Sequence, residues 1–396
     1  MALTLICEPG DPRLVALLAG LTPADIVKAI RRGDRLLGRP CPEAWRYGVT
    51  GIDERLGRTV ALAKAAGLRW ITPADRGWPD QLGDLDHVDD VPGATGAPLG
   101  LWIRGERSLA DLIGSSVAIV GARDCTSYGA QVAAEIAADV SSMGVTVVSG
   151  AAYGIDASAH RGALSTLAPT VAVLACDAAT DYPRAHGPML NRIAGEGLVI
   201  SEQPPGQVPT KSRFLSRNRL IAALTGGTVV VEARRRSGSL NTLGWADRLG
   251  RVTMAVPGPV SSPQSVGPHL AVRDGRALVV TSGADVVDEL AALGALAAAS
   301  GEGEAGRGVT ESTAWDELSC DQARVLDALD WKQSLGLPDI ARRARVGQTA
   351  ARQALEGLVA AGWVAGVGSS SWILTRRADL EQGAAAPTVG EWTAPN

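Results

Sequence analysis

The segment Lys211–Arg219 combines positive charge with an aromatic ring in a way that suits nucleic-acid chemistry. It surrounds Phe214, the only phenylalanine of the chain, with four cationic side chains: Lys211, Arg213, Arg217 and Arg219. Cationic side chains neutralise the phosphates of a strand, and an aromatic face stacks an unpaired base. The alternative is the basic start of a helix whose phenylalanine lies in the core. We favour binding, because the predicted sheet fills its core with Val, Leu, Ile and Ala.

Two further cations follow predicted strands. Arg123 stands two residues after Gly121, which ends the apolar run Val117–Val120, and Arg184 belongs to the group Tyr182-Pro183-Arg184. A planar guanidinium pairs bidentately with phosphate, so both arginines suit an anionic ligand. For Arg123, a salt bridge across the strand ends is an equally open interpretation.

A third group, Ser237-Gly238-Ser239, follows Arg234-Arg235-Arg236 at the predicted start of a helix. The free backbone N–H groups of a helix N-terminus attract phosphate, and the two hydroxyls add donors. An ordinary N-cap explains the serines equally well. Together with Gly121, the three residues form the weaker of the predicted phosphate sites.

The sequence shows no legible catalytic or metal centre. Asp156 and His160 lie four residues apart, on one face of a predicted helix, but no Ser or Cys nucleophile is identifiable with them. We therefore favour capping and packing roles for both. The five cysteines and four histidines are scattered without the spacing of zinc ligands or of a disulfide framework. We predict no catalytic residue, no metal and no cofactor.

The candidate residues must be positioned by strands, since the chain from Val117 reads as strand, glycine turn, helix, strand. The runs Val117–Val120 and Val145–Val148 are typical of buried parallel strands, and Ala130–Met143 has helical spacing. Further strands are predicted at Val171–Leu174, Leu198–Ile200, Thr228–Val231, Val252–Val256 and Ala277–Val280. This alternation predicts an α/β fold with a doubly wound, mostly parallel sheet, which binds ligands at the carboxyl ends of its strands. The first turn lacks G-x-G-x-x-G, which argues against a dinucleotide site.

Composition divides the chain of 396 residues into six predicted segments. They are a helical N-terminal domain at 1–75, a connector at 76–115, the sheet domain at 116–292, a flexible linker at 293–314, a winged-helix domain at 315–376 and a disordered tail at 377–396. We predict a winged helix because three helices are followed by a two-stranded hairpin. The predicted helices are Asp321–Leu329, Leu337–Arg345 and Gln348–Ala361, and the predicted strands are Trp363–Val367 and Trp372-Ile373-Leu374.

Overall charge and hydropathy restrict the function classes. The net charge of −4 means that any nucleic-acid surface must be a local patch. No apolar run approaches the ~18 residues that a membrane span needs, and the N-terminus lacks the basic start and apolar core of a signal peptide. We expect a soluble, cytoplasmic protein with no membrane partner.

Across residues 116–292 the chain carries a set of motifs: V-A-I-V-G-A-R, V-S-G-A-A-Y-G-I-D-A-S-A-H-R-G-A, Y-P-R, S-R-N-R-L-I-A, V-V-V-E-A with R-S-G-S-L-N-T, and A-V-P-G-P. As a set, in this order, they resemble the DNA-processing protein A family (DprA/Smf). The resemblance implies a Rossmann-like domain that binds single-stranded DNA and forms a homodimer. It also implies protection of incoming DNA, loading of the recombinase RecA in natural transformation, and no enzymatic activity.

The resemblance also assigns binding residues. Arg123 matches the family's Gly-Ser/Ala-Arg arginine, Arg184 matches its Tyr-Pro-basic residue, and Ser149-Gly150 matches the Ser-Gly before Gly-Ile-Asp. The family's Phe-Pro-x-Arg-Asn-Arg run is matched except at its Pro, which Leu215 replaces. Val266-Gly267-Pro268-His269 replaces a Gly-Cys-His turn and is assigned no role. The predicted DNA-binding set is therefore Arg123, Ser149, Gly150, Arg184, Lys211, Phe214, Arg217, Asn218 and Arg219.

Two other functions remain open. Gly226-Gly227-Thr228 with Glu232 partly matches the Pro-Gly-Gly-x-Gly-Thr-x-x-Glu motif of nucleotide phosphoribohydrolases of the lysine-decarboxylase-like family. Thr225 replaces the Pro of that motif, and its second glycine pair is missing. The winged helix, in contrast, suggests a transcription regulator that binds duplex DNA in a sequence-dependent way.

Overall fold

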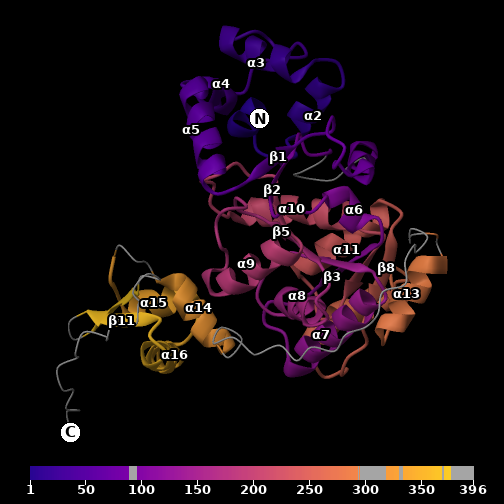
Figure 1. Cartoon of the computed structure of the whole chain (residues 1–396), viewed down its shortest axis with the longest axis vertical. Helices are drawn as coiled ribbons and strands as arrows, with labels where there is room; N and C mark the ends of the chain where they lie inside the picture. The colour runs from indigo at the N-terminus through magenta and orange to yellow at the C-terminus, as the bar shows by residue number, and fades with distance from the viewer. Residues whose placement is uncertain (89–95, 293, 295–317, 330–332, 368–369, 376–396) are drawn as a thin grey trace. The chain divides into compact units, whose positions relative to one another are not determined.

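The computed structural model describes residues 1–88, 96–292, 294, 318–329, 333–367 and 370–375 (Figure 1). These residues form two compact units. The first runs from Met1 to Tyr182 and resumes at His186, and the second combines Pro183–Ala185 with the described residues from 318 onward. The predicted tail at 377–396, and the predicted linker at 293–314 apart from residue 294, lie outside the described residues.

Within the described chain, nine strands form one sheet in the order β1-β2-β6-β5-β4-β3-β7-β8-β9. They are β1 (Arg69–Ile71), β2 (Leu101–Arg104), β3 (Ser116–Val120), β4 (Thr146–Ser149), β5 (Thr170–Leu174), β6 (Leu198–Ser201), β7 (Gly227–Val230), β8 (Val252–Ala255) and β9 (Leu278–Val279). All neighbours from β6 to β9 pair in parallel. Every residue of β3 to β7 is buried, which explains their largely apolar sequences. The predicted Rossmann-like α/β sheet is confirmed.

The sheet extends beyond the segment 116–292. Strand β1 comes from the segment predicted to be helical and β2 from the predicted connector, and the two pair with each other in antiparallel fashion. Strand β2 also pairs in antiparallel fashion with β6 and so joins the pair to the parallel strands. The two strands have only three and four residues, so neither gives the longer apolar run that revealed the parallel strands.

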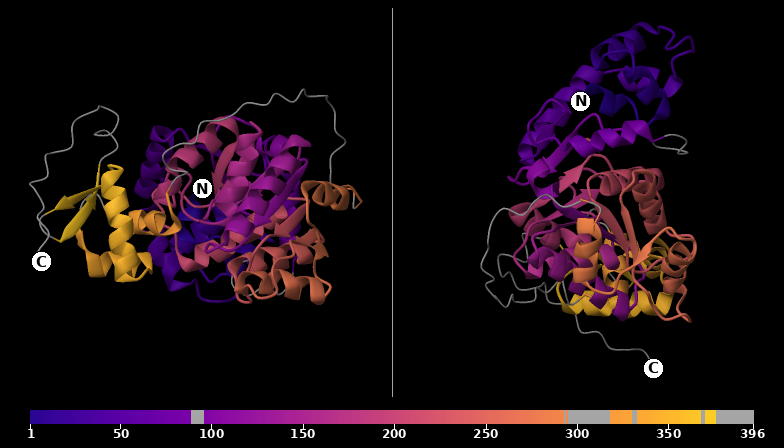
Figure 2. Two further views of the ribbon diagram at one scale, coloured as in Figure 1. Left: turned by 90° about the horizontal axis from the view of Figure 1, so that it is seen from below. Right: turned by 90° about the vertical axis from the view of Figure 1, so that its right-hand side faces the viewer.

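Helices cover both faces of the sheet (Figures 1 and 2). Helices α6, α10 and α11 pack on one face against side chains such as Val120 and Val148. Helices α7, α8 and α13 pack on the other face against Ile119 and Val147. The helices and 3-10 helices from α6 to α13 are α6 (Leu109–Ile113), α7 (Ser127–Ser142), α8 (Ile155–Ser165), η2 (Arg184–His186), α9 (Gly187–Glu196), α10 (Lys211–Ala223), α11 (Gly238–Arg248), η3 (Pro263–Ser265), α12 (Val266–Arg273) and α13 (Gly283–Ala292).

The N-terminal segment is helical up to β1. Its helices are α1 (Ala2–Ile6), α2 (Pro12–Leu18), α3 (Pro23–Arg32), α4 (Glu43–Val49) and α5 (Ile52–Ala65), and the 3-10 helix η1 (Asp80–His87) follows β1. Helices α1 to α5 enclose a separate apolar core that includes Ile26, Ile30 and Trp45. Helix α3 begins at Pro23, and the Thr22 hydroxyl caps it by accepting a hydrogen bond from the Asp25 N–H at 3.2 Å.

The second unit contains helices and a small antiparallel sheet. In chain order its elements are α14 (Cys320–Ala328), β10 (Leu335–Gly336), α15 (Leu337–Ala344), α16 (Gln348–Ala360), β11 (Val364–Val367) and β12 (Ser371–Leu374). The described strands pair in the order β10-β12-β11. The predicted helices and hairpin are present, and their assignment to the winged-helix class stays a prediction. No helix in the described part of the chain is long and apolar enough to cross a lipid bilayer.

The packing of α7 against α8 generates a prediction. A Cβ atom on Gly162 of α8 would overlap the backbone carbonyl oxygen of Ala134 on α7. We therefore expect Gly162→Ala to lower the free energy of unfolding by about 1–3 kcal/mol, because the helices must move apart. Gly195 on α9 is exposed with open space around it, so Gly195→Ala should instead raise stability by about 0.4–1 kcal/mol. Urea unfolding of both variants would test this, and equal effects would contradict it.

Candidate nucleic-acid interface

The carboxyl ends of β3 and β7 flank the point where the strand order reverses. Strand β3 has β4 on one side and β7 on the other. The chain adds β4, β5 and β6 on the first side of β3, and it then crosses over to add β7, β8 and β9 on the second side. Ligands of doubly wound sheets bind in the crevice at this point. The loops after the two strands carry Arg123 and Arg234-Arg235-Arg236, and α10 packs beside α11, which follows β7.

Phe214 lies in the first turn of a helix. Helix α10 begins at Lys211, after Thr210, whose hydroxyl accepts a hydrogen bond from the Arg213 N–H at 3.3 Å. Leu215, which stands where the family has Pro, continues this helix. Lys211 is exposed and Phe214 is half-buried, whereas every residue from Ser216 to Ala223 is buried. The predicted cationic segment is therefore divided into an exposed start and a buried end.

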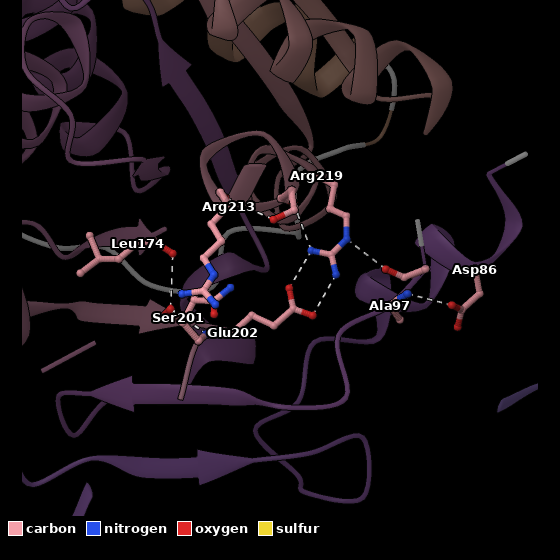
Figure 3. Close-up of polar contacts among 10 residues, drawn as sticks. Asp86, Ala97, Leu174, Ser201, Glu202, Arg213 and Arg219 are labelled. Carbon is pink, nitrogen blue, oxygen red and sulfur yellow. Dashed lines mark hydrogen bonds and ion pairs between the residues drawn. The ribbon is translucent and has the colours of Figure 1, made fainter. Parts of the chain in front are cut away.

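Arg219 belongs to the buried end (Figure 3). Its side chain has no exposed surface, and its guanidinium donates two hydrogen bonds to the Glu202 carboxylate, at 2.8 and 2.9 Å. It also donates to the backbone carbonyls of Gly96 and Ser216, both at 3.2 Å. This corrects the predicted DNA contact: Arg219 joins α10 to the end of β6 and to the segment after residue 96.

Arg217 is buried with its guanidinium turned toward the ends of β4 and β5. Its Nη1 donates to the carbonyl oxygen of Gly150 at 2.9 Å and to that of Val173. Burial lowers the pKa of Arg217 to about 10, opposed by the negative charge of Asp156. A side chain at residue 150 would overlap this guanidinium, so the glycine there makes room for Arg217. The predicted contact residues Arg217 and Gly150 thus support each other beneath the surface.

Ser149 and Asn218 are also engaged inside the protein. The Ser149 hydroxyl is fully buried and donates to the carbonyl of Ile119 at 2.6 Å. The Asn218 amide donates to the carbonyl of Gly238 at 3.1 Å and to the Asn241 side chain at 3.3 Å. Asn218 thereby connects α10 to the start of α11. In this structure both side chains hold the strand and helix ends in place.

The exposed side chain of Arg123 contacts Phe214. Its guanidinium carbon lies over the Phe214 ring, 4.5 Å from the ring centroid. The Tyr182 ring lies 5.9 Å from the Phe214 ring, tilted by 48°. Tyr182 was not among the predicted site residues, although it directly precedes Pro183 and Arg184 in a motif that the sequence made visible. The three side chains come from three different loops or helices and meet at the Phe214 ring.

Lys211 and Arg184, the two remaining cations of the predicted DNA-binding set, are also exposed. Lys211 stands at the first position of α10. Arg184 is exposed at the start of η2, in the segment Pro183–Ala185 that belongs to the second compact unit. Arg184 is therefore not part of the interface on the first unit.

The start of α11 extends the interface on the side of β7. Ser237 is its N-cap and accepts a hydrogen bond from the Ser239 N–H at 3.4 Å, as the sequence predicted for a helix start. Gly238 is exposed and Ser239 is buried. In the preceding loop Arg234 pairs with Asp124 at 2.6 Å, while Arg235 and Arg236 are exposed and have no hydrogen bond to the described chain.

Gly121 shapes the loop that carries Arg123. Its neighbour Ala122 donates a backbone hydrogen bond to Glu232 at 2.7 Å and accepts one from Ile155 at 3.2 Å. A Cβ at Gly121 would lie 2.8 Å from the Glu232 carbonyl oxygen, so only glycine allows this close approach. The predicted phosphate role of Gly121 is untested, and its structural role is to bring the β3 loop against the end of β7.

The acidic and histidine side chains near the interface are structural. Buried Glu232 accepts hydrogen bonds from the Thr126 N–H at 2.8 Å and from its hydroxyl at 2.6 Å, at the start of α7. Burial raises the pKa of Asp156, against the opposing charge of Arg217. Burial also lowers the pKa of His160 to about 3, and its Nδ1 lies 2.9 Å from the Thr170 hydroxyl. The packing roles expected for Asp156 and His160 agree with these positions.

The buried pair on α10 generates a second prediction. Removing one member of a buried ion pair strands the other charge away from water, which costs about 3–5 kcal/mol. We expect Arg219→Met to lower the free energy of unfolding by that amount, because Glu202 is left without its partner. The double variant Arg219→Met, Glu202→Leu should recover most of the loss. Denaturant unfolding would measure both, and a double variant less stable than the single one would contradict this account.

Comparison with known proteins places the chain in a family. Residues 69–291 match the family model of DNA recombination-mediator protein A. The chain is 38% identical over 344 residues to a Mycobacterium tuberculosis protein that carries the name DNA processing protein DprA, covering 86% of this chain and 84% of that protein. It is 37% identical over 222 residues to the protein Smf of Escherichia coli, 56% of each chain. The crystal structure of DNA processing protein A from Streptococcus pneumoniae superposes with a TM-score of 0.56 at 32% identity, covering 69% of this chain and 95% of that one. The chain therefore belongs to the DNA recombination-mediator protein A family, whose members include the DNA processing proteins DprA and Smf.

Proposed function

We propose that this protein binds single-stranded DNA at the carboxyl edge of its parallel strands. The observation that carries the proposal is the stack of Arg123 on Phe214, with exposed Lys211 beside it on α10. Arg235, Arg236 and the start of α11 extend the positive surface along the neighbouring loop. A chain of net charge −4 that gathers these cations at one sheet edge has the local patch that a polyanion requires.

The chemistry of this edge favours single strands over duplex. A stack of arginine and aromatic side chains offers flat surfaces to bases, and bases expose their faces only when they are unpaired. The exposed cations serve phosphates, which carry no sequence information. We infer binding with little sequence preference.

Three further roles form part of the proposal and rest on family membership. The protein would protect incoming strands in natural transformation, load the recombinase RecA onto them, and act as a homodimer. It would do so without catalysis, which is supported by the engagement of Glu232 and Asp156 in internal hydrogen bonds. Glu232 is the residue that the phosphoribohydrolase reading needs, and its carboxylate caps α7. The second unit, if it is a winged helix, would add a separate duplex contact.

A salt series tests the central claim. Log affinity for a single strand should fall with log salt by roughly 0.7 per phosphate neutralised, and single strands should bind more tightly than duplex of the same length. Fluorescence anisotropy with labelled oligonucleotides of several sequences would measure both. Equal affinities for single strands and duplex at every salt concentration would contradict the proposal.

Arg123→Ala tests the position of the interface. Loss of a positive charge and of the stack should weaken single-strand binding by about 1–3 kcal/mol and reduce the salt slope by about 0.7. Arg276 supplies a matched control, since it is exposed but precedes β9 and so lies toward the amino edge of the sheet. Arg276→Ala should leave affinity and slope nearly unchanged. If the two variants lose the same affinity, the interface lies elsewhere.

A further inference from the structure

Helices α15 and α16 of the second unit contact each other and are joined by a short turn, Arg345 to Gly347. Backbone hydrogen bonds fix this turn: the Val346 N–H donates to the Ala341 carbonyl at 3.1 Å, and the Ala351 N–H donates to the Gly347 carbonyl at 2.8 Å. Arg345 adopts the left-handed conformation there, with a φ of 56°. Two packed helices joined by such a short turn with a glycine have the order of a helix-turn-helix, whose second helix enters the major groove of duplex DNA.

Helix α16 buries one face and leaves the opposite face open. Its buried residues are Ala351, Ala354, Leu355 and Leu358. The exposed side chains of its first half include Thr349, Arg352 and Gln353, which share one face because they lie three and four residues apart. Arginine binds the edge of guanine and glutamine that of adenine, each through two hydrogen bonds, and threonine binds several bases. The exposed acid Glu356 lies one turn further along the helix. The first half of the open face therefore carries side chains that contact base edges in duplex DNA.

Three arginines near this face keep their charge. Arg343 at the end of α15, Arg345 in the turn and Arg352 on α16 are exposed. Their guanidinium groups form no ion pair or hydrogen bond with the part of the chain that the structure describes. Arg342, in contrast, is paired with Asp339 at 2.5 Å. The three unpaired guanidinium groups are therefore available to phosphates or base edges outside the chain.

So few cations give only weak affinity for duplex DNA by themselves. Non-specific binding at physiological salt has dissociation constants of about 10⁻⁴–10⁻⁶ M, and a small number of phosphate contacts corresponds to the weak end of this range. The same chain carries the proposed single-strand interface on its first unit. A second site on one chain meets its ligand at an effective concentration that reaches about a millimolar. Against a duplex dissociation constant of about 10⁻⁴ M, this concentration raises the overall affinity about tenfold.

Resting on the proposed function, we propose that the preferred ligand is a junction between single-stranded and duplex DNA. The single strand occupies the interface on the first unit, and α16 of the second unit enters the major groove of the adjoining duplex. Arg352 and Gln353 face the base edges, and Arg343 and Arg345 bind the flanking phosphates. Neither unit alone distinguishes a junction from its parts, so the preference arises from their presence on one chain.

Three labelled DNAs test this proposal with the full chain: a single strand, a duplex, and the same duplex carrying that strand as a tail. Fluorescence anisotropy should show that the junction binds about tenfold more tightly than the single strand, and more tightly still than the duplex. The salt slope should also be steeper for the junction than for the single strand, by about 0.9 for each duplex phosphate that is neutralised.

Three variants of the second unit locate the duplex contact. Arg352→Ala should lower the affinity for the junction nearly to that for the single strand, and Arg343→Ala should reduce the salt slope of the junction by about 0.9. Neither variant should change the affinity for the single strand. Arg324→Ala is the matched control, because Arg324 lies on α14 and is paired with Asp321 at 4.0 Å, and it should bind all three DNAs as the parent does. Melting temperatures show whether each variant is folded at the assay temperature.

The outcomes separate this inference from the proposed function. Equal affinities of the parent protein for the junction and the single strand would overturn the inference and leave single-strand binding intact. A duplex that binds as tightly as the junction would overturn it too, since the strand would then contribute nothing. Equal losses with Arg352→Ala and Arg324→Ala would show that α16 does not make the contact. If the parent protein does not bind the single strand, the proposed function itself fails.

Discussion

The buried ion pair between Arg219 and Glu202 determines where α10 lies, and the candidate interface depends on the position of α10. A guanidinium without solvent contact must keep its carboxylate partner, since the loss of either leaves an uncompensated charge in the interior. Glu202 follows β6 directly, so the pair fastens the helix to the carboxyl edge of the sheet. Arg217 and Asn218 add hydrogen bonds to the ends of β4 and β5 and to the start of α11.

Helix α10 therefore has two roles: its start forms part of the surface, and its later turns support that surface from inside. The first turn of α10 carries Lys211 and Phe214 toward the surface, and the later turns direct polar side chains into the protein. Inward arginines and an asparagine cost desolvation, and they are tolerated because backbone carbonyls and a carboxylate receive their N–H groups. The result is a rigid support under a small, charged and aromatic surface.

In the loops after β3 and β7, polar groups are also satisfied by partners within the protein. Glu232 binds the start of α7, Gly121 allows the two loops to approach, and Asp124 takes Arg234. Each of these contacts removes a charge or a donor from the surface. What remains exposed is cationic, which is why a protein with excess acidic residues can present a positive edge.

The sequence by itself determined the parallel sheet, the predicted element order and the family. Buried parallel strands are continuous apolar runs separated by helical periods, and that signal is local. It also located the cations near strand ends. Only the tertiary structure decided which of these cations face outward. In the sequence, nothing distinguishes Arg217 and Arg219 from Lys211. Their burial depends on partners such as Gly150 and Glu202, which are distant along the chain. For the same reason the sequence did not reveal β1 and β2, whose pairing is long-range, or the contacts of Arg123 and Tyr182 with Phe214.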